Sequence, residues 1–573
     1  MLSSLKGLLR PARLIALALA ALAATAVALE ASWLVWAVIA LSVALVALPW
    51  WQPLTPAMEA RLPGVHPAVA RLVAGAGRSA AAMWLALGAL GTDAALREDS
   101  RDWAVALVFL IGAGSAGFTT LAAAPALRHD LRVSTLAARA SRAVPWGIAA
   151  IYVAGVLTLP ALARWPQAPS TALAVAAGLL AASGAAVVLR SLASRGRQRK
   201  RALDEVARLA PAFVVYQSGP HGSAYQLAMW LPFLERSGLP FVVVARQEAL
   251  YTELRGITDA PVVYAGSLQA VDDVLAHSGG TVIYVNNAAA NTHAVRLYQL
   301  HHVQILHGDS DKASSRNPIS AMYDELWVAG QAAIDRYGDH GIVIPQERFR
   351  IVGRPQVAGI DGASGAATPR VALYAPTWNG FFGDANYSSL PHGLAIVQAL
   401  LDEGLTVIFR EHPYSSGSAQ LRAAIADIHG LLADDAERTG RQHRYGPGLF
   451  AELDLIGCFN ASDIAVTDIS AVPNDYLFSG KPFAIMEMQP DTLARKPGRP
   501  TLAAAAYTAR PGDDIPAWIG RLVRDDGKAT SRAEAREHYL GPFAREGYED
   551  VFVQTLRETV ATHRLVGELD TEE

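Results

Sequence analysis

The first third of the 573-residue chain contains six long apolar stretches. They span residues 14–29, 33–48, 80–96, 103–127, 143–162 and 171–189. Each approaches the roughly 20 residues that cross a bilayer core as a helix. The sequence therefore predicts an α-helical membrane domain of about six spans in residues 1–202, in which the first two spans form a tight hairpin.

Lysine and arginine are unevenly distributed over the connections between these stretches. One side of the predicted domain receives most of them, whereas the other side receives only Arg97, Arg101 and Arg164. By the positive-inside rule, we expect a multi-pass protein of the cell membrane with both termini in the cytoplasm. The basic run RGRQRKR at 195–201 fits anionic lipid headgroups at this position better than nucleic acid, so no nucleic-acid partner is expected.

Two further features exclude other classes of protein. No apolar stretch carries an ionisable residue near its middle, whereas carriers and pumps usually place one near the midplane. Cys458 is the only cysteine, which excludes an intrachain disulfide and a cysteine-cluster metal site. Transport is therefore not the leading hypothesis.

From residue 203 onward, short β-branched runs alternate with amphipathic helical stretches, as in parallel α/β sheets. We predict two doubly wound Rossmann-like domains, 203–357 and 370–573, joined by a Gly- and Ala-rich linker at 358–369. Such paired domains leave a cleft between the carboxyl ends of their strands. The predicted strands are 212–216, 241–245, 261–265, 281–285, 303–307, 325–329 and 349–353 in the first domain, and 370–377, 405–413, 463–468 and 483–487 in the second.

Polar residues stand where several predicted strands end. Thr377, Arg410, His412 and Asp468 follow strands of the second domain, and His307 closes a strand of the first. The carboxyl ends of parallel strands open into the ligand crevice, so these side chains are candidate site residues. His307 is placed to act as a general base on an attacking hydroxyl. A histidine that only hydrogen-bonds to a neighbouring loop fits the sequence equally well.

The residues after His307 suggest contact with a substrate. Gly308 lets a substrate approach the backbone, and Lys312 can offset pyrophosphate charge. Between Gly308 and Lys312, the two aspartates of DSD (309–311) also match a loose metal-binding D-x-D pattern. The double-domain context argues against that alternative, and we predict no metal ligands.

The segment TDISAVPNDYLFSGKPF at 467–483 predicts a phosphate-binding helix start. Asp468, Ser470 and the following amides open a helix whose free N–H groups attract an anion. Pro473 fits a first helical turn, where no amide hydrogen is missed, and Asp475 continues the helix. A plain helix cap explains Ser470 alone but not the whole segment.

Together, these segments resemble the CDP-glycerol:poly(glycerophosphate) glycerophosphotransferases that polymerise teichoic acids, a family with the GT-B fold. The resemblance covers roughly residues 205 to 545. It is carried by HG with a nearby lysine (His307, Gly308, Lys312), YAPTW (374–378), HP (412–413) and DISAV…DYLFSGKP (468–482).

The resemblance implies transfer of a phosphopolyol from CDP-glycerol or a related CDP-alcohol to a hydroxyl of a lipid-linked, prenyl diphosphate acceptor. CMP is released, and no cofactor or metal is required. His307 would be the base or acceptor-side histidine, and His412, Ser470 and Asp475 would hold the donor. The other substrate-binding residues expected are Gly308, Lys312, Thr377, Arg410 and Asp468.

The chain departs from the family pattern at three places. It has HGDS at 307–310 where the family commonly has HGTP, Asn379 where an arginine follows PTW, and GRPQV at 353–357 in place of PRND-like residues. The identity of the polyol therefore stays open. Two alternatives remain, namely a GT-B glycosyltransferase that uses a nucleotide sugar and a catalytically inactive membrane scaffold.

Overall fold

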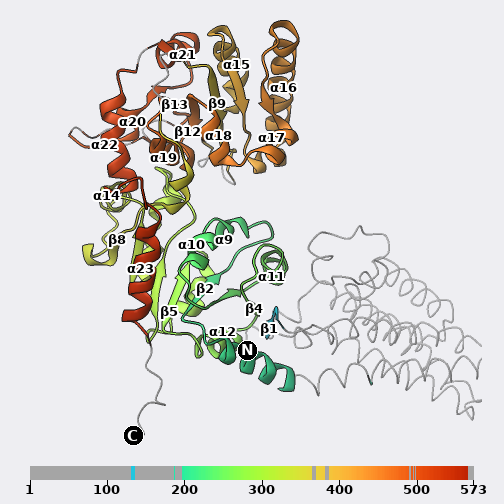
Figure 1. Ribbon diagram of the computed structural model, residues 1–573, viewed down its shortest axis with the longest axis vertical. Helices are drawn as coiled ribbons and strands as arrows, with labels where there is room; N and C mark the ends of the chain where they lie inside the picture. The colour runs from blue at the N-terminus through green and yellow to red at the C-terminus, as the bar shows by residue number, and fades with distance from the viewer. Residues whose placement is uncertain are drawn as a thin grey trace, which may run out of the picture. The chain divides into compact units, whose positions relative to one another are not determined.

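The computed structural model describes residues 131–135, 186, 196–363, 369–380, 386–489, 492–493, 496, 498–524 and 526–564 (Figure 1). The chain forms two compact units. Unit 1 comprises residues 1–209, 219–223 and 242–277, and unit 2 comprises residues 210–218, 224–241 and 278–573. The predicted linker lies partly outside the described residues, and the predicted domain boundaries stay predictions.

The predicted fold class was wrong in its membrane part. Among the residues that the structure describes, no helix is both long and apolar enough to cross a membrane. Helix α16 (Ala419–Thr439) has the length of a span, with 21 residues, but carries acidic and basic side chains along it. The six apolar stretches on which the prediction depended lie outside the described residues, apart from Ala186.

Unit 1 holds a short sheet in which β4 (Val262–Ala265) pairs with residues 243–245 of β3 (Phe241–Ala245) in parallel and with β1 (Leu131–Val133) in antiparallel orientation. Helices α11 (Glu248–Leu254) and α12 (Leu268–Leu275) follow the two parallel strands. Strand β1 lies in the basic connection predicted between the fourth and fifth apolar stretches, where no strand was expected. Arg132 of β1 donates to Glu248 Oε1 at 2.7 Å, so this arginine is part of the α/β unit.

The first sheet of unit 2 runs β2 (Phe213–Gln217), β5 (Thr281–Tyr284), β6 (His301–Gln304), β7 (Glu325–Val328) and β8 (Phe349–Ile351), all in parallel. Two helices follow β2, α9 (Tyr225–Ala228) and α10 (Leu231–Arg236). Pro232 lies in the first turn of α10, the position that tolerates a missing N–H, so a new helix begins there.

The second sheet of unit 2 has the parallel order β11 (Arg444–Tyr445), β10 (Thr406–Phe409), β9 (Val371–Ala375), β12 (Ile464–Asp468), β13 (Phe483–Met486) and β14 (Tyr507–Ala509). The short strands β11 and β14 were not predicted. Strand β6 also differs from its prediction, because it ends at Gln304 and leaves His307 in the following turn.

Helices cover both faces of this second sheet (Figure 1). On one face, Tyr374, Phe409 and Val466 pack with α15 (Gly393–Asp402), α16 and α21 (Ile515–Arg524). On the other face, alternate strand residues such as Leu373 and Ala465 pack with α18 (Leu455–Ala461), α19 (Ala471–Tyr476), α20 (Leu502–Ala505) and α22 (Ala529–Leu540). Both sheets of unit 2 are therefore parallel and Rossmann-like, as in GT-B proteins.

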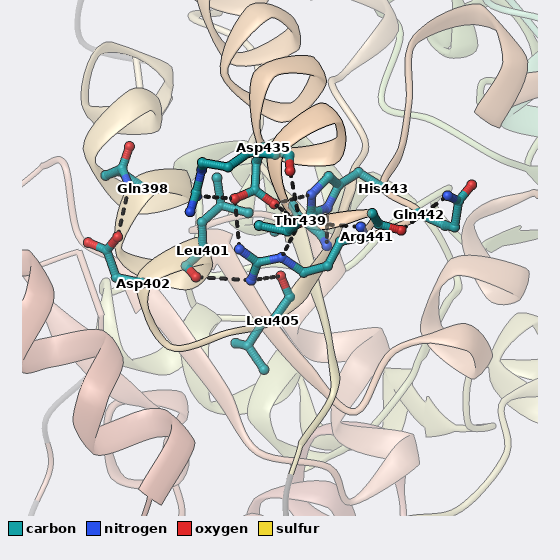
Figure 2. A network of polar contacts seen from close by, with 12 residues as sticks. Gln398, Leu401, Asp402, Leu405, Asp435, Thr439, Arg441, Gln442 and His443 are labelled. Carbon is teal, nitrogen blue, oxygen red and sulfur yellow. Dashed lines mark hydrogen bonds and ion pairs between the residues drawn. The ribbon is translucent and has the colours of Figure 1, made fainter.

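A buried carboxylate fixes the carboxyl end of α16 (Figure 2). Asp435 is 2% exposed and accepts hydrogen bonds from Arg441 at 2.7 Å, His443 at 2.9 Å and Thr439 at 3.0 Å. Burial by itself raises the pKa of Asp435, but these hydrogen bonds outweigh it and the pKa is lowered. His443 Nδ1 accepts from Val407 N at 3.0 Å, so the network links α16 to β10.

We expect Asp435→Asn to lower the free energy of unfolding by about 3 kcal/mol at neutral pH, because it removes the acceptor charge from a buried cluster of donors. The wild-type advantage should shrink as the pH falls below about 4, since a carboxyl with a lowered pKa loses its stabilising charge only there. Chemical denaturation over a pH series measures both effects. Asp434→Asn, at the exposed neighbouring position, is the control. Equal stability of the two variants would contradict the prediction.

Candidate active site

The turn after β6 determines the direction of the His307 side chain. Leu306, immediately before it, has a positive φ of 52°, a strained conformation for a residue with a branched side chain. Two hydrogen bonds hold this conformation. Leu306 N donates to Gln304 Oε1 at 2.8 Å, and Trp230 Nε1 donates to Leu306 O at 2.7 Å. The direction of His307 is therefore set by Gln304 at the end of β6 and by a tertiary contact from Trp230.

His307 is a neutral histidine with a free basic nitrogen. Its Nδ1 lies 2.9 Å from Val285 O. A carbonyl oxygen only accepts hydrogen bonds, so Nδ1 carries the proton and the lone pair stands on Nε2. Burial, with a smaller contribution from Arg354, lowers the pKa of His307 below its ordinary value. His307 Nε2 can therefore accept a proton at neutral pH.

The neutral ring of His412 is the opposite tautomer to that of His307. Its Nδ1 accepts a hydrogen bond from Tyr414 N at 3.1 Å, so in the neutral ring Nε2 carries the proton. The ring stacks on Trp378, with 6.0 Å between centroids. Burial and the charge of Lys312 lower the pKa of His412 to about 4. His412 is therefore a neutral hydrogen-bond donor at neutral pH.

Lys312 joins the loop after β6 to the second sheet. Its Nζ donates to Thr377 Oγ1 at 3.2 Å and lies 5.2 Å from the ring centroid of Tyr387. Burial lowers the pKa of Lys312, while the nearby carboxylate of Asp468 opposes that shift. The contact brings Lys312 together with Thr377, which follows β9, and with Asp468, which ends β12.

Asp468 is fully buried at the end of β12. Its Oδ2 accepts from Thr377 N at 2.7 Å and from Ser389 N at 3.0 Å, whereas Oδ1 has no hydrogen-bond partner among the described residues. Burial raises the pKa of Asp468 to about 7, although the two amides and Lys312 oppose the shift. This carboxyl thus titrates in the physiological range.

Ser470 begins α19, as predicted, and its Oγ accepts from Val472 N at 3.2 Å. Gly308 lies beside this helix start, because a Cβ at its position would stand 3.7 Å from Ala471 Cβ. Asn474 Nδ2 donates to Asp309 O at 3.0 Å. The loop after β6 and the start of α19 are therefore neighbours.

Two predicted site residues have structural partners instead. Asp475 forms a buried two-point ion pair with Arg354, whose Nη2 lies 3.1 Å from Asp475 Oδ2. Arg410 donates to Leu453 O at 2.8 Å and lies 4.6 Å from the Phe450 ring centroid. The structure thus does not bring Asp475 and Arg410 into the Lys312–Asp468 cluster. Sequence reasoning missed Arg354, whose position just after a predicted strand was its only signal.

The acids of the DSD segment also have a buried partner. Arg336 contacts both Asp309 and Asp311, at 3.1 Å from Asp311 Oδ1. Tyr539 OH donates to the other oxygen of Asp311 at 3.3 Å. Burial raises the pKa of Asp311 to about 6. These carboxylates therefore stabilise the loop through Arg336.

Two cavities flank the site residues. A cavity of about 30 Å³ behind the turn after β6 is lined in part by Leu306, Gly308 and Arg354. It has room for only a water molecule or two. A cavity of about 620 Å³ beside His412 is lined in part by Glu411 and Phe450. The second cavity has the size of a nucleotide-binding pocket.

Asp468→Asn should stabilise the protein at high pH. In the unfolded chain the carboxyl loses its proton near pH 4, but in the folded chain only near pH 7, so wild-type stability falls as the pH rises between these values. An asparagine oxygen keeps the Thr377 and Ser389 hydrogen bonds without that charge. We expect the variant to be more stable by on the order of 3 kcal/mol at about pH 8 and by less at about pH 5.

Denaturant titrations at the two pH values, with Asp434→Asn as control, measure this difference. A variant less stable than wild type at about pH 8 would show that the charged form of Asp468 is the one the fold favours.

Several solved structures are similar to this chain at low identity. A putative UDP-N-acetylglucosamine 2-epimerase from Listeria monocytogenes is 14% identical with a TM-score of 0.40, over 62% of this chain and 100% of that chain. The wall teichoic acid polymerase TagF is 13% identical with a TM-score of 0.41, over 66% of this chain and 95% of that chain. The UDP-GlcNAc 2-epimerase of Methanocaldococcus jannaschii is 10% identical with a TM-score of 0.34, over 60% of this chain and 99% of that chain. No curated protein matches the chain.

One family model matches the part of the chain that contains strands β9 to β13 of the second sheet. Residues 357–499 match the CDP-Glycerol:Poly(glycerophosphate) glycerophosphotransferase family. The matched segment contains His412, Asp468, Ser470 and Asp475, but not the segment from His307 to Lys312. The individual roles of these residues stay predictions. The resemblance predicted from the sequence is confirmed over this segment, which is similar to the CDP-glycerol:poly(glycerophosphate) glycerophosphotransferases.

Proposed function

We propose that the protein transfers a phosphopolyol from a CDP-alcohol, such as CDP-glycerol, to a hydroxyl of a lipid-linked acceptor in the synthesis of a teichoic acid or related cell-surface polymer. The observation that carries this proposal is the family match over residues 357–499. The two neutral histidines and the Lys312–Asp468 cluster support it, because phosphoryl transfer needs a base and cationic or N–H donors.

In the proposed reaction, the acceptor oxygen attacks the phosphorus that bears the polyol. His307 Nε2 takes the hydroxyl proton as the new P–O bond forms. The bond to the bridging oxygen of CMP breaks, and the electron pair leaves with CMP. His412 Nε2–H and Lys312 stabilise the charge that develops on the phosphate oxygens.

The cavity beside His412 suits a cytosine base. Glu411 Oε2 is buried and has no hydrogen-bond partner among the described residues. A carboxylate oxygen accepts from the amino group of cytosine, whereas uracil presents a carbonyl oxygen at the same position and repels it. Glu411 therefore favours a CDP donor over the UDP donor of the alternative glycosyltransferase.

A lipid-linked acceptor, such as one on a prenyl diphosphate, follows from the family resemblance. Such an acceptor would bring the reaction to the cytoplasmic face of the cell membrane. The alternative of an inactive scaffold does not account for two histidines held in opposite tautomers or for a buried carboxyl kept beside Lys312.

We expect the purified full-length protein to release CMP from CDP-glycerol or another CDP-alcohol when a prenyl-diphosphate-linked acceptor is present. His307→Ala should lower the rate about 10²- to 10⁴-fold, because the general base is lost. His277→Gln, at an exposed histidine in unit 1, should keep the full rate. Chromatography of the released nucleotide, with UDP-sugars as parallel substrates, measures this. Release of UDP in place of CMP, or full activity of His307→Ala, would refute the assignment.

Glu411→Gln should reduce the preference for cytosine nucleotides. We expect wild type to bind CDP at least about tenfold more tightly than UDP, since a hydrogen bond to a charged group stabilises binding by roughly 1.5–3 kcal/mol. The variant should lose most of that difference. Calorimetric titration with each nucleotide measures it, and Glu452→Gln, exposed at the end of α17 (Gly446–Glu452), is the control. Equal CDP and UDP affinities in wild type would exclude this role for Glu411.

A further inference from the structure

Three side chains with metal-binding groups meet at the amino end of the first sheet of unit 2. His301 is the first residue of β6, Glu325 is the first residue of β7, and His563 follows the last residue of α23 (Asp550–Thr562). Their ligand atoms all lie within 4.8 Å of one another. His307 follows the carboxyl end of β6, so this cluster stands at the other end of the strands from the candidate active site.

The distances within the cluster suit one small cation. His301 Nε2 lies 3.4 Å from Glu325 Oε1. The imidazole rings of His301 and His563 are stacked with centroids 3.5 Å apart, so one of the two rings has to rotate before both lone pairs can point at the same ion. Two ligand atoms that bind the same tetrahedral zinc ion at about 2.0–2.1 Å are themselves about 3.4 Å apart. His301 Nε2 is also buried without a hydrogen-bond partner among the described residues.

The surrounding groups orient the cluster and balance its charge. Glu325 Oε2 accepts from Trp327 Nε1 at 2.6 Å, which fixes the carboxylate as an outer-shell partner does in metal sites. Asp324 adds a second carboxylate, 4.0 Å from His301 Nδ1. Arg350 is a positive charge 3.9 Å from Glu325 Oε2. Two carboxylates therefore face a single guanidinium, and the cluster favours a cation.

We propose that His301, Glu325 and His563 form a site for a divalent transition metal, with zinc as the best fit and water as the fourth ligand. Two imidazoles and one carboxylate are a nitrogen-rich ligand set, which suits zinc better than magnesium or calcium. The ion would fix the end of α23 to the amino ends of β6 and β7. The site is independent of the proposed transferase function, because it lies away from His307 and His412.

Zinc titration of the full-length protein, stripped with a chelator and dialysed, tests the site. We expect wild type to bind one Zn²⁺ per chain in competition with a chromogenic chelator, and Co²⁺ to give the visible spectrum of a tetrahedral complex. His563→Gln and Glu325→Gln should each weaken binding by at least about tenfold. In Glu325→Gln the new amide oxygen can still accept from Trp327, so folding of that variant is expected and is checked by circular dichroism. His277→Gln should bind like wild type.

Hydrogen exchange gives a second readout that does not depend on catalysis. Zinc should slow amide exchange in the last turns of α23 in wild type and in His277→Gln, but not in His563→Gln or Glu325→Gln. The proposal is overturned if wild type shows no saturable zinc binding, or if both ligand variants bind zinc as tightly as wild type does.

Discussion

The buried carboxyl of Asp468 is the interaction on which the candidate active site depends. Removal of a carboxylate from water is costly unless hydrogen bonds and a nearby charge compensate. The amides of Thr377 and Ser389 donate hydrogen bonds to Asp468, and the positive charge of Lys312 lies nearby. These interactions offset part of the cost. Thr377 and Ser389 lie in the connection between β9 and α15, and Lys312 lies in the connection after β6, so the carboxyl fixes these two connections of unit 2 relative to the end of β12. The pKa of about 7 shows that compensation is incomplete.

Much of the α/β fold could be predicted from local pattern. The run at 241–245 coincides with β3, and the run at 483–487 overlaps β13 (Phe483–Met486), because a buried parallel strand is a short β-branched or apolar run. Strand β6 was predicted two residues late, since His301 and His302 interrupt the apolar run although His302 is buried. Hydropathy alone also led to the membrane domain, which no helix of the described residues supports.

The site was harder to predict because a strand-end position does not determine a side chain's partner. Lys312 lies near Asp468, whereas Asp475 and Arg410 are held by Arg354 and by Leu453 O. These partners lie far away in the sequence, since Asp475 and Arg354 are 121 positions apart along the chain. Only the packed fold decides which charged residue faces a substrate and which one holds two segments together.

A continuous set of contacts connects α23 to the proposed base. Phe552 of α23 packs on Trp230, with 4.9 Å between ring centroids. The indole of Trp230 donates to Leu306 O, and that bond helps to hold the strained turn that aims His307. A strained conformation persists only when its surroundings enforce it. The position of α23, which the His301–Glu325–His563 cluster would fix at its end, therefore contributes to the direction of His307 although no residue of α23 belongs to the candidate active site.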